Sequence, residues 1–350
     1  MHRLLSLVKT ANSMGAFGKT LKQIASLGSR KEVPASTVDL YRLAAASLGS
    51  HRGQASALKD CISEDEISQY LSSSEKLSLS DGYRIQAEVE KYLIDKHGWK
   101  KSGFKVGATS KAVQSRLGIS TPFFGAIFQE NLSLQDFGGD CLSCDLEIDG
   151  ANQSQWCSFG NISLAQHNCR GIEAEFAFIL KKDIELREKD YSWEEVLDHI
   201  AEVVPCIEIC GSRYAVPIPP GNAPLVIADG AGNSAFLVCD ANAKGHVCQD
   251  WVKNQSSDMN VTTTINLQQV IEGSGREVLD HPIHSLTWLA NALNQEYLHM
   301  SDEEQYPWRK LQAKDIVATG ATSGLMAVAA DSEVVVDFQS FGAIEIITRQ

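Results

Sequence analysis

Two glutamates stand in an apolar run at residues 171–180, where Glu173 and Glu175 are separated by one alanine. If this run is a β-strand, its side chains alternate between two faces, so both carboxylates point to the same side. Placing two like charges on a surface that turns apolar one residue later is costly unless something neutralises them. A divalent cation with oxygen ligands would do so. A solvated strand end is the alternative, and an E-x-E motif alone favours it.

A third glutamate, Glu208, stands in a second apolar run at residues 203–210, which is rich in β-branched residues and predicts another strand. A carboxylate buried in such a strand needs a partner. Lys105 lies between Phe104 and Val106 in a third predicted strand. Three carboxylates and one lysine on apolar strands indicate a metal site more than a solvated surface.

The elements that must position these residues fall into two parts. Residues 36–100 show helical periodicity and are expected to form a helical N-terminal segment, with one helix from about 81 to 96. Residues 101–350 change to short β-runs punctuated by glycine. The predicted fold class is therefore α+β, with helices first and a β-rich body after them.

Three stretches of the β-rich part have weaker patterns. Residues 122–128 are apolar and are expected to contain a turn, and residues 129–170 are polar, as in an irregular surface insertion. Residues 225–227 are interpreted as a short strand before a glycine-rich turn at 229–234. That turn has neither the P-loop lysine nor dinucleotide-binding spacing, so a phosphate site is not indicated.

Composition and charge exclude two classes of partner. Hydrophobic residues make up 43% and charged residues 21% of the 350 residues, as in an ordinary globular protein. No apolar run approaches the ~18–20 residues that a membrane span needs. The net charge is −13, and residues 1–31 hold six lysines and arginines with no acidic residue, so the rest of the chain is still more acidic. Such an acidic body does not favour nucleic acid.

The basic N-terminus bears on localisation. Residues 1–35 are rich in Ser, Leu and Ala, which is typical of an organellar transit peptide, and a frayed tail or an ordinary amphipathic helix is the alternative. We therefore expect a cytoplasmic protein, or a mitochondrial or other organellar one if this segment is a transit peptide.

Nine cysteines at irregular spacing favour a reducing compartment over a disulfide framework. Cys206, Cys210 and Cys239 lie in apolar runs and are interpreted as inert core residues. A weak zinc signal comes from one C-x-x-C pair with scattered cysteines after it, and free thiols in a surface insertion are the favoured alternative. These cysteines are Cys141, Cys144, Cys157 and Cys169.

Six motifs, in the same order over most of the chain, resemble the hydratase/decarboxylase branch of the fumarylacetoacetate hydrolase superfamily, whose type members are 2-keto-4-pentenoate hydratases. The motifs are Gly103–Ser110, Ile172–Glu175, Pro205–Arg213, Ala228–Asp229, Gly273–Gly275 with His281–Pro282, and Asp315–Gly320. The resemblance extends from about residue 37 to the C-terminus.

The resemblance implies a roll-like, β-rich catalytic domain of the fumarylacetoacetase C-terminal type, usually in a homo-oligomer. It implies Mg²⁺ or Mn²⁺ held by Glu173, Glu175 and Glu208, and it places Lys105 beside a small 2-oxo acid substrate. We expect burial near the metal to lower the pKa of this lysine, which would move a proton or hold the substrate carboxylate.

Two departures from the family pattern matter for the reaction. Phe123 stands where the family pattern has an acidic residue thought to relay a proton, and Gly230 and Gly232 replace an Asn and a Ser in the glycine-rich turn. Other groups would have to substitute for the relay. The candidates are Asp229, Ser274 and His281.

The expected function is that of a metal-dependent lyase on a short 2-oxo acid or its dienol, with 2-keto-4-pentenoate hydratase-like activity favoured. Decarboxylation of a 2-oxo diacid and hydrolytic C–C cleavage of an acylpyruvate are alternatives, since all three reactions stabilise an enolate at the same position. An alternative of another class is an oligomeric metal-binding homologue with impaired catalysis.

Overall fold

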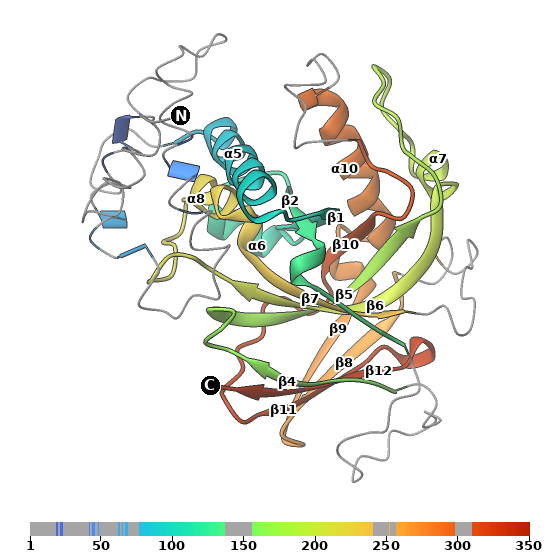
Figure 1. Cartoon of the computed structure of the whole chain (residues 1–350). Coiled ribbons are helices and arrows are strands. Elements are labelled where there is room, and N and C mark those ends of the chain that lie inside the picture. Colours follow the sequence, from blue (N-terminus) through green and yellow to red (C-terminus); the bar gives the residue numbers. More distant parts are fainter. Residues whose placement is uncertain are drawn as a thin grey trace.

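The computed structural model describes residues 77–136, 156–240, 257–297 and 310–350, together with Val252 and scattered positions before residue 77. Within these ranges the strands form two sheets, which Figure 1 shows crossing one below the other, with helices gathered above the larger sheet. This arrangement confirms the predicted α+β fold class.

The larger sheet has seven strands and carries all the residues of the predicted metal site. In spatial order they are β2 (Phe123–Phe128), β1 (Lys101–Gly107), β10 (Ile316–Ala321), β5 (Cys169–Leu180), β6 (Ile200–Gly211), β7 (Asn233–Asp240) and β3 (Leu132–Asp136). The pairs β1–β10 and β3–β7 are parallel, and the other neighbours are antiparallel.

The smaller sheet has five strands. In spatial order they are β4 (Trp156–Ser163), β12 (Ala343–Arg349), β11 (Glu333–Asp337), β8 (Asn260–Ile265) and β9 (Gln269–Ser274). The predicted alternating pair near the C-terminus is confirmed, since β11 and β12 are antiparallel neighbours.

The described helices surround the larger sheet and its connections. They are α5 (Leu79–His97), α6 (Lys111–Leu117), α7 (Trp193–Leu197), α8 (Ala223–Ala228) and α10 (Pro282–Tyr297), with short 3₁₀ turns η2 (Gln129–Asn131), η4 (Gly230–Gly232), η6 (Gly275–Glu277) and η7 (Gln339–Phe341). None of the described helices combines the length and apolar character needed to cross a membrane.

Local sequence explains the limits of α5. The Ser78 hydroxyl accepts a hydrogen bond from the Asp81 backbone N–H, and the Asp81 carboxylate accepts one from the Ser78 backbone N–H, which forms a capping box. Gly98 ends the helix in the left-handed conformation, with φ of 70°. The apolar face of α5 is buried in a cluster shared with α8, which confirms the helix expected in this region.

The main hydrophobic core lies between the two sheets and α10. The face of β5 opposite the glutamates contributes Phe176, whose ring centroid lies 5.4 Å from that of Phe338 and 5.8 Å from that of Phe341. Because these residues are buried, the alternation predicted for residues 171–180 is confirmed, with one face wholly in the core and the other available for the glutamates.

Three local expectations differ from the structure. Residues 225–227 belong to helix α8, whose first turn contains Pro224, a position where a missing N–H costs little. Residues 123–128 form the unbroken strand β2, and Gly125 is needed there because a Cβ would lie 2.7 Å from the carbonyl oxygen of Gly230. Segment 129–170 is not irregular throughout, since β3 and β4 lie within it and pair with β7 and β12.

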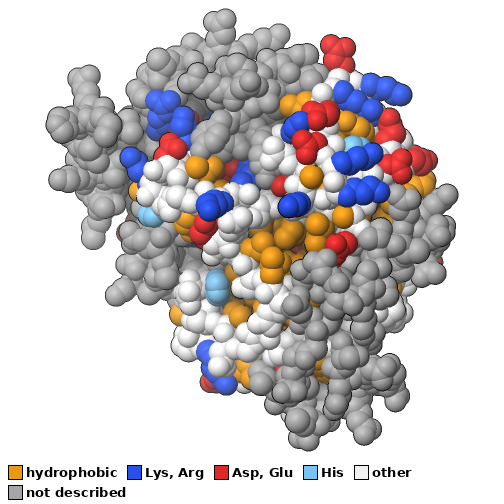
Figure 2. All heavy atoms as spheres, turned by 45° about the vertical axis from the view of Figure 1, so that its right-hand side comes forward, with side chains coloured by type: hydrophobic (Ala, Val, Ile, Leu, Met, Phe, Trp, Pro, Cys, Tyr) orange, Lys and Arg blue, Asp and Glu red, His pale blue; other side chains and the backbone are white. Residues whose placement is uncertain are grey.

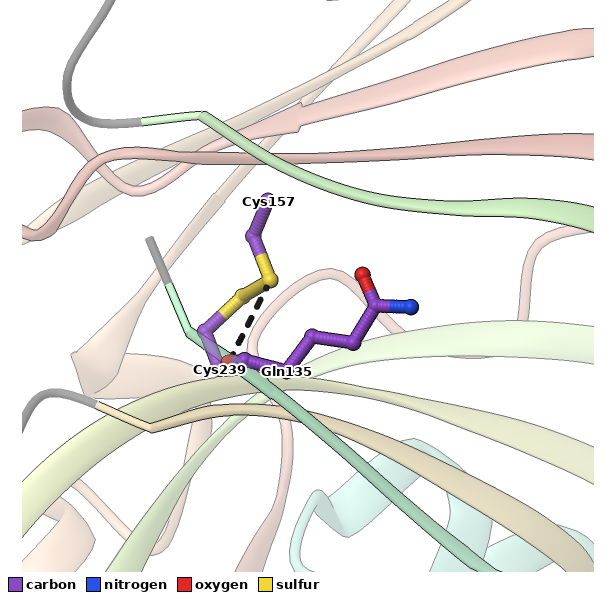
Figure 3. The surroundings of a disulfide bond; sticks show 3 residues. All are labelled: Gln135, Cys157 and Cys239. Atoms are coloured by element: carbon purple, nitrogen blue, oxygen red, sulfur yellow. Dashed lines mark hydrogen bonds between the residues drawn. A yellow bond between two sulfur atoms is a disulfide. The ribbon is translucent and has the colours of Figure 1, made fainter. Parts of the chain in front are cut away.

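The two sheets are joined covalently. Figure 3 shows the disulfide bond between Cys157 of β4 and Cys239 of β7, with Gln135 beside it. The interpretations of Cys239 as an inert core thiol and of Cys157 as a free one are therefore wrong. The two residues are 82 positions apart, so their proximity depends on how the sheets stack.

Other sequence expectations lie outside the described residues. The proposed transit peptide at 1–35 is described only at three scattered positions, and Cys141 and Cys144 are not described. Figure 2 shows lysine, arginine and acidic side chains intermixed on one face of the described part of the molecule rather than a single basic patch.

Candidate metal centre

Strands β5 and β6 bring the predicted acidic residues together. Glu173 and Glu208 are direct partners in the antiparallel ladder, and Glu175 lies two positions further along β5, opposite Cys206. The side chains of Glu175 and Glu208 are fully buried, whereas that of Glu173 is partly exposed. The Gly320 backbone N–H on β10 donates a hydrogen bond of 2.8 Å to Glu175 Oε2. The three carboxylates therefore form one group on one face of the sheet.

Lys105 reaches this group from β1. Its Nζ lies 3.2 Å from Glu208 Oε2 and donates a hydrogen bond of 3.1 Å to the carbonyl oxygen of Ala231. In the sheet, β10 and β5 separate β1 from β6, which would place the two backbones about 14 Å apart in a flat sheet. We infer that the sheet curls so that both side chains converge on its concave face.

The charges at this site shift one another's pKa. Burial, reinforced by the carboxylates of Glu208 and Glu173, raises the pKa of Glu175 well above its usual value. Burial likewise raises the pKa of Glu208 to about 7, although Lys105 opposes the change. Burial lowers the pKa of Lys105, but the nearby carboxylates outweigh it and the pKa is raised. In the metal-free protein the expected lowering of this pKa is therefore not found, because Glu208 is in direct contact.

The donor set fits a divalent cation. Glu175 Oε1 and Glu208 Oε1 are buried and accept no hydrogen bond from the described residues. Three carboxylates face one ammonium group, so negative charge remains uncompensated in a buried place. A cation that prefers oxygen ligands, such as Mg²⁺ or Mn²⁺, would satisfy both the orphaned oxygens and the charge.

The tightest group of possible metal ligands among the described residues includes Cys210, which the sequence interpretation took for an inert core residue. Ligand atoms of Glu173, Glu208 and Cys210 all lie within 4.8 Å of one another. Cys210 is a free cysteine two residues after Glu208 on β6. The signal that could have revealed it was the same period-two alternation that linked Glu173 with Glu175.

A cavity of about 990 Å³ opens beside the metal centre. Glu173 and Ser274 line it, together with the end of β1, the segment that starts α6, and residues 320–324. Ionisable side chains at its edge include two cations and four carboxylates, namely Lys111, Arg276, Glu173, Glu272, Glu277 and Asp280. Of the residues of the metal centre, Glu173 lines this cavity, whereas Lys105, Glu175 and Glu208 do not. The cavity is large enough for a small organic acid.

Two of the predicted catalytic residues lie elsewhere. Asp229 is buried against Arg213, accepting hydrogen bonds of 2.9 Å from its backbone N–H and 2.6 Å from its Nε. His281 accepts a hydrogen bond of 3.1 Å at Nδ1 from the Ile283 backbone N–H. Neither residue lines the cavity. Of the three substitutes considered for the proton relay, only Ser274 lies at the cavity wall.

Phe123, which stands where the family pattern has an acidic residue, lies next to Lys105. Its ring centroid is 5.9 Å from Lys105 Nζ, and the side chain is buried, with 4% of its surface exposed. The ring lies over Gly107, where a Cβ would come within 2.4 Å of it. An apolar ring thus lies beside the lysine, at the sequence position where the family pattern has an acidic residue.

The chain is similar in sequence to known hydratases and decarboxylases. No protein-family profile matches the chain. It is 25% identical over 257 residues to 2-keto-4-pentenoate hydratase of Paraburkholderia xenovorans, covering 72% of this chain and 77% of the relative. It is 24% identical over 273 residues to 4-oxalocrotonate decarboxylase of Pseudomonas putida, covering 77% and 85%.

The fold is shared with a solved structure. The crystallised 4-oxalocrotonate decarboxylase of Pseudomonas putida G7, complexed with magnesium and adipate, has a TM-score of 0.65 and 20% sequence identity to this chain. The match covers 91% of this chain and all of the other. The similarity confirms the predicted roll-like α+β fold.

Proposed function

We propose that this chain belongs to the hydratase/decarboxylase branch of the fumarylacetoacetate hydrolase superfamily, whose hydratases and decarboxylases it resembles, and that it is a divalent-metal-dependent lyase on a short 2-oxo acid or its 2-hydroxydienoate form. The observation that carries the proposal is the group of Glu173, Glu208 and Lys105 beside the 990 Å³ cavity. It combines a donor set for a cation with a fixed ammonium group, next to space for a small organic acid.

Glu173, Glu175 and Glu208 would hold Mg²⁺ or Mn²⁺. When bound, such a cation supplies Lewis acidity that stabilises negative charge on the C2 oxygen of a 2-oxo acid. Glu175 is kept in place by the Gly320 N–H, and Glu208 by Lys105. These contacts fix the carboxylates before a substrate arrives, so little reorganisation is needed.

Lys105 would bind the substrate and move a proton. Its ammonium group is anchored by Glu208 and the Ala231 carbonyl oxygen, and a protonated amine has three donors, of which these contacts use two. The third can donate a hydrogen bond to a substrate carboxylate. The carboxylates that raise the pKa of Lys105 would be offset by a bound cation, which would allow this group to move a proton during tautomerisation. Thr109, Ser110 and Lys111 line the same cavity and would contact the distal part of the substrate.

Hydration is the first candidate reaction, because hydratases are among the relatives. It requires water to be delivered to the distal double bond of the dienoate and a proton to be placed on the carbon skeleton. Ser274, the cavity-lining candidate, would orient that water.

Decarboxylation of a 2-oxo diacid is the second candidate, and the buried ring of Phe123 beside Lys105 favours it. Loss of CO₂ needs stabilisation of the resulting dienolate but no positioned water. An apolar wall beside the lysine is compatible with this reaction and unfavourable for a proton relay. Relatives of both kinds exist at about equal identity.

Product analysis distinguishes these activities. Purified protein with Mg²⁺ or Mn²⁺ would be incubated with 2-hydroxypenta-2,4-dienoate, with 4-oxalocrotonate or oxaloacetate, and with acetylpyruvate, and followed by NMR. A 4-hydroxy-2-oxo acid identifies hydration, CO₂ release identifies decarboxylation, and pyruvate with acetate identifies hydrolysis. Metal binding without turnover of any substrate would contradict the proposed lyase function and support a non-catalytic homologue.

A homo-oligomer also remains a proposal, based on the family resemblance. Size-exclusion chromatography with light scattering would test it, and a monomer at all concentrations would contradict it.

A further inference from the structure

The side chain of Cys210 lies beside the carboxylates of the metal centre. It lies on β6 at the second position after Glu208, so the two side chains share a face of the sheet. Its sulfur lies within 4.8 Å of a carboxylate oxygen of both Glu173 and Glu208. Among the described residues, no other set of three His, Cys, Asp or Glu ligand atoms is this close.

The spacing agrees with ligands of one ion. Two ligands of a zinc ion can be separated by at most the sum of their bond lengths, which is about 4.5 Å for a thiolate and a carboxylate. The observed limit exceeds this by a few tenths of an ångström, which a side-chain adjustment can supply. Glu208 Oε1, buried and without a hydrogen-bond donor among the described residues, independently indicates that a ligand binds at this point.

We propose that Cys210 is a further ligand of this metal site, and that the mixed carboxylate–thiolate set favours a thiophilic divalent cation such as Zn²⁺ or Co²⁺ over Mg²⁺. The inference rests on the metal site of the proposed function. Thiolates select softer ions, whereas Mg²⁺ takes oxygen ligands almost exclusively. Binding through sulfur releases the thiol proton to solvent, so charge and atoms balance.

Cys206 provides a matched control. It is on the same strand and the same face as Glu208, two residues before it, and it is fully buried. It packs in an apolar cluster with Ala177 and Val204, and it is not one of the three clustered ligands. Substituting Cys206 therefore tests for a general effect of losing a buried thiol on this strand.

The test is a Co²⁺ titration followed by absorption spectroscopy. Because Cys141-x-x-Cys144 could bind Co²⁺ by itself, the full-length chain carries Cys141→Ser and Cys144→Ser throughout. In this background we expect visible d–d bands together with a near-ultraviolet thiolate-to-cobalt band. Cys210→Ser should lose the near-ultraviolet band and keep the d–d bands, and Cys206→Ala should keep both.

Metal competition gives a second measurement. Loss of an outer-shell partner alone weakens metal binding by about 10–100-fold, so removing a direct ligand should weaken Zn²⁺ binding by about 100-fold or more. Mg²⁺ affinity should be unchanged in Cys210→Ser. An equal loss for both metals would contradict the proposal.

The outcomes separate the two proposals. Co²⁺ binding without a near-ultraviolet band in the background protein overturns the role of Cys210 and leaves the carboxylate site intact, even if the Cys210→Ser variant fails to fold. Retention of that band in Cys210→Ser also overturns it. Absence of any bound Co²⁺ overturns the metal site itself.

Discussion

Lys105 and Glu208 form a buried ion pair, with 3.2 Å between Nζ and Oε2, although two other strands separate their own strands in the sheet. A lysine and a glutamate this deeply buried are stable only together, because either charge alone would lose its hydration without compensation. The pair therefore requires the sheet to curl, and the same curl brings Lys105 to the carboxylates of the metal centre.

Removing a carboxylate should remove the metal. Glu173→Gln and Glu208→Gln keep the side-chain shape but lose the charge, and we expect each to weaken Mn²⁺ binding by about 100-fold or more, with a parallel loss of lyase activity. Isothermal titration calorimetry with Mn²⁺ measures the affinity. Glu272→Gln is the control, because this residue lines the same cavity but lies outside the ligand cluster. Wild-type Mn²⁺ affinity in the Glu208 variant would rule out the proposed site.

Phe123 should set the balance between hydration and decarboxylation. Phe123→Asp places a carboxylate beside Lys105, so we expect the rate of dienoate hydration to rise relative to the rate of oxo-diacid decarboxylation. The measurement is the ratio of the two values of kcat/KM. Phe123→Leu, which stays apolar, should leave the ratio unchanged. Efficient hydration by the wild-type protein, with no gain in Phe123→Asp, would show that another group carries the proton.

Asp229 should be structural rather than catalytic. Its buried carboxylate accepts hydrogen bonds from the backbone N–H and the Nε of Arg213. Asp229→Asn leaves the guanidinium without its charge partner and should lower the free energy of unfolding by about 3–5 kcal/mol. Denaturant unfolding measures this. Asp331→Asn, which removes an exposed partner of Arg349, should cost less than about 1 kcal/mol. Loss of activity without loss of stability in Asp229→Asn would instead support a catalytic role.

Ser274 and His281 should differ in their effect on activity. Ser274 lines the cavity and His281 does not. If Ser274 donates one hydrogen bond to a charged substrate or orients water, Ser274→Ala should lower kcat/KM by roughly tenfold, equivalent to about 1.4 kcal/mol. His281→Gln should keep kcat/KM within about twofold of wild type, since the half-buried ring lies outside the cavity and an amide oxygen can still accept a hydrogen bond. Steady-state kinetics with the identified substrate measures both values of kcat/KM. A larger loss in His281→Gln than in Ser274→Ala would support a catalytic role for His281.

Reduction of the disulfide should weaken the contact between the sheets. Cys157 and Cys239 link β4 to β7 across 82 residues, so breaking the bond should lower the free energy of unfolding by about 2–5 kcal/mol. Urea unfolding with and without reductant measures the effect. The double variant Cys157→Ala/Cys239→Ala should match the reduced wild type and should not respond to reductant. Equal stability of the oxidised and reduced wild type would contradict this expectation.

The sequence by itself determined the properties that depend on near neighbours along the chain. Alternation of side chains placed Glu173 and Glu175 on one face of a strand, and an apolar context marked Glu208 and Lys105 as buried charges in need of partners. The capped helix α5 was visible for the same reason, since caps and periodicity act over a few residues. Six ordered motifs were enough to indicate the similarity to hydratases and decarboxylases that the comparisons also find.

Tertiary structure alone decided which distant residues meet. The ladder between β5 and β6 sets Glu173 opposite Glu208 and brings Cys210 into the cluster, and the curl of the sheet carries Lys105 to the same point. Asp229 was a candidate for the proton relay, but its carboxylate is satisfied by Arg213. These outcomes follow from strand order, register and sheet curvature, which depend on the packing of the whole core and leave no local mark in the sequence.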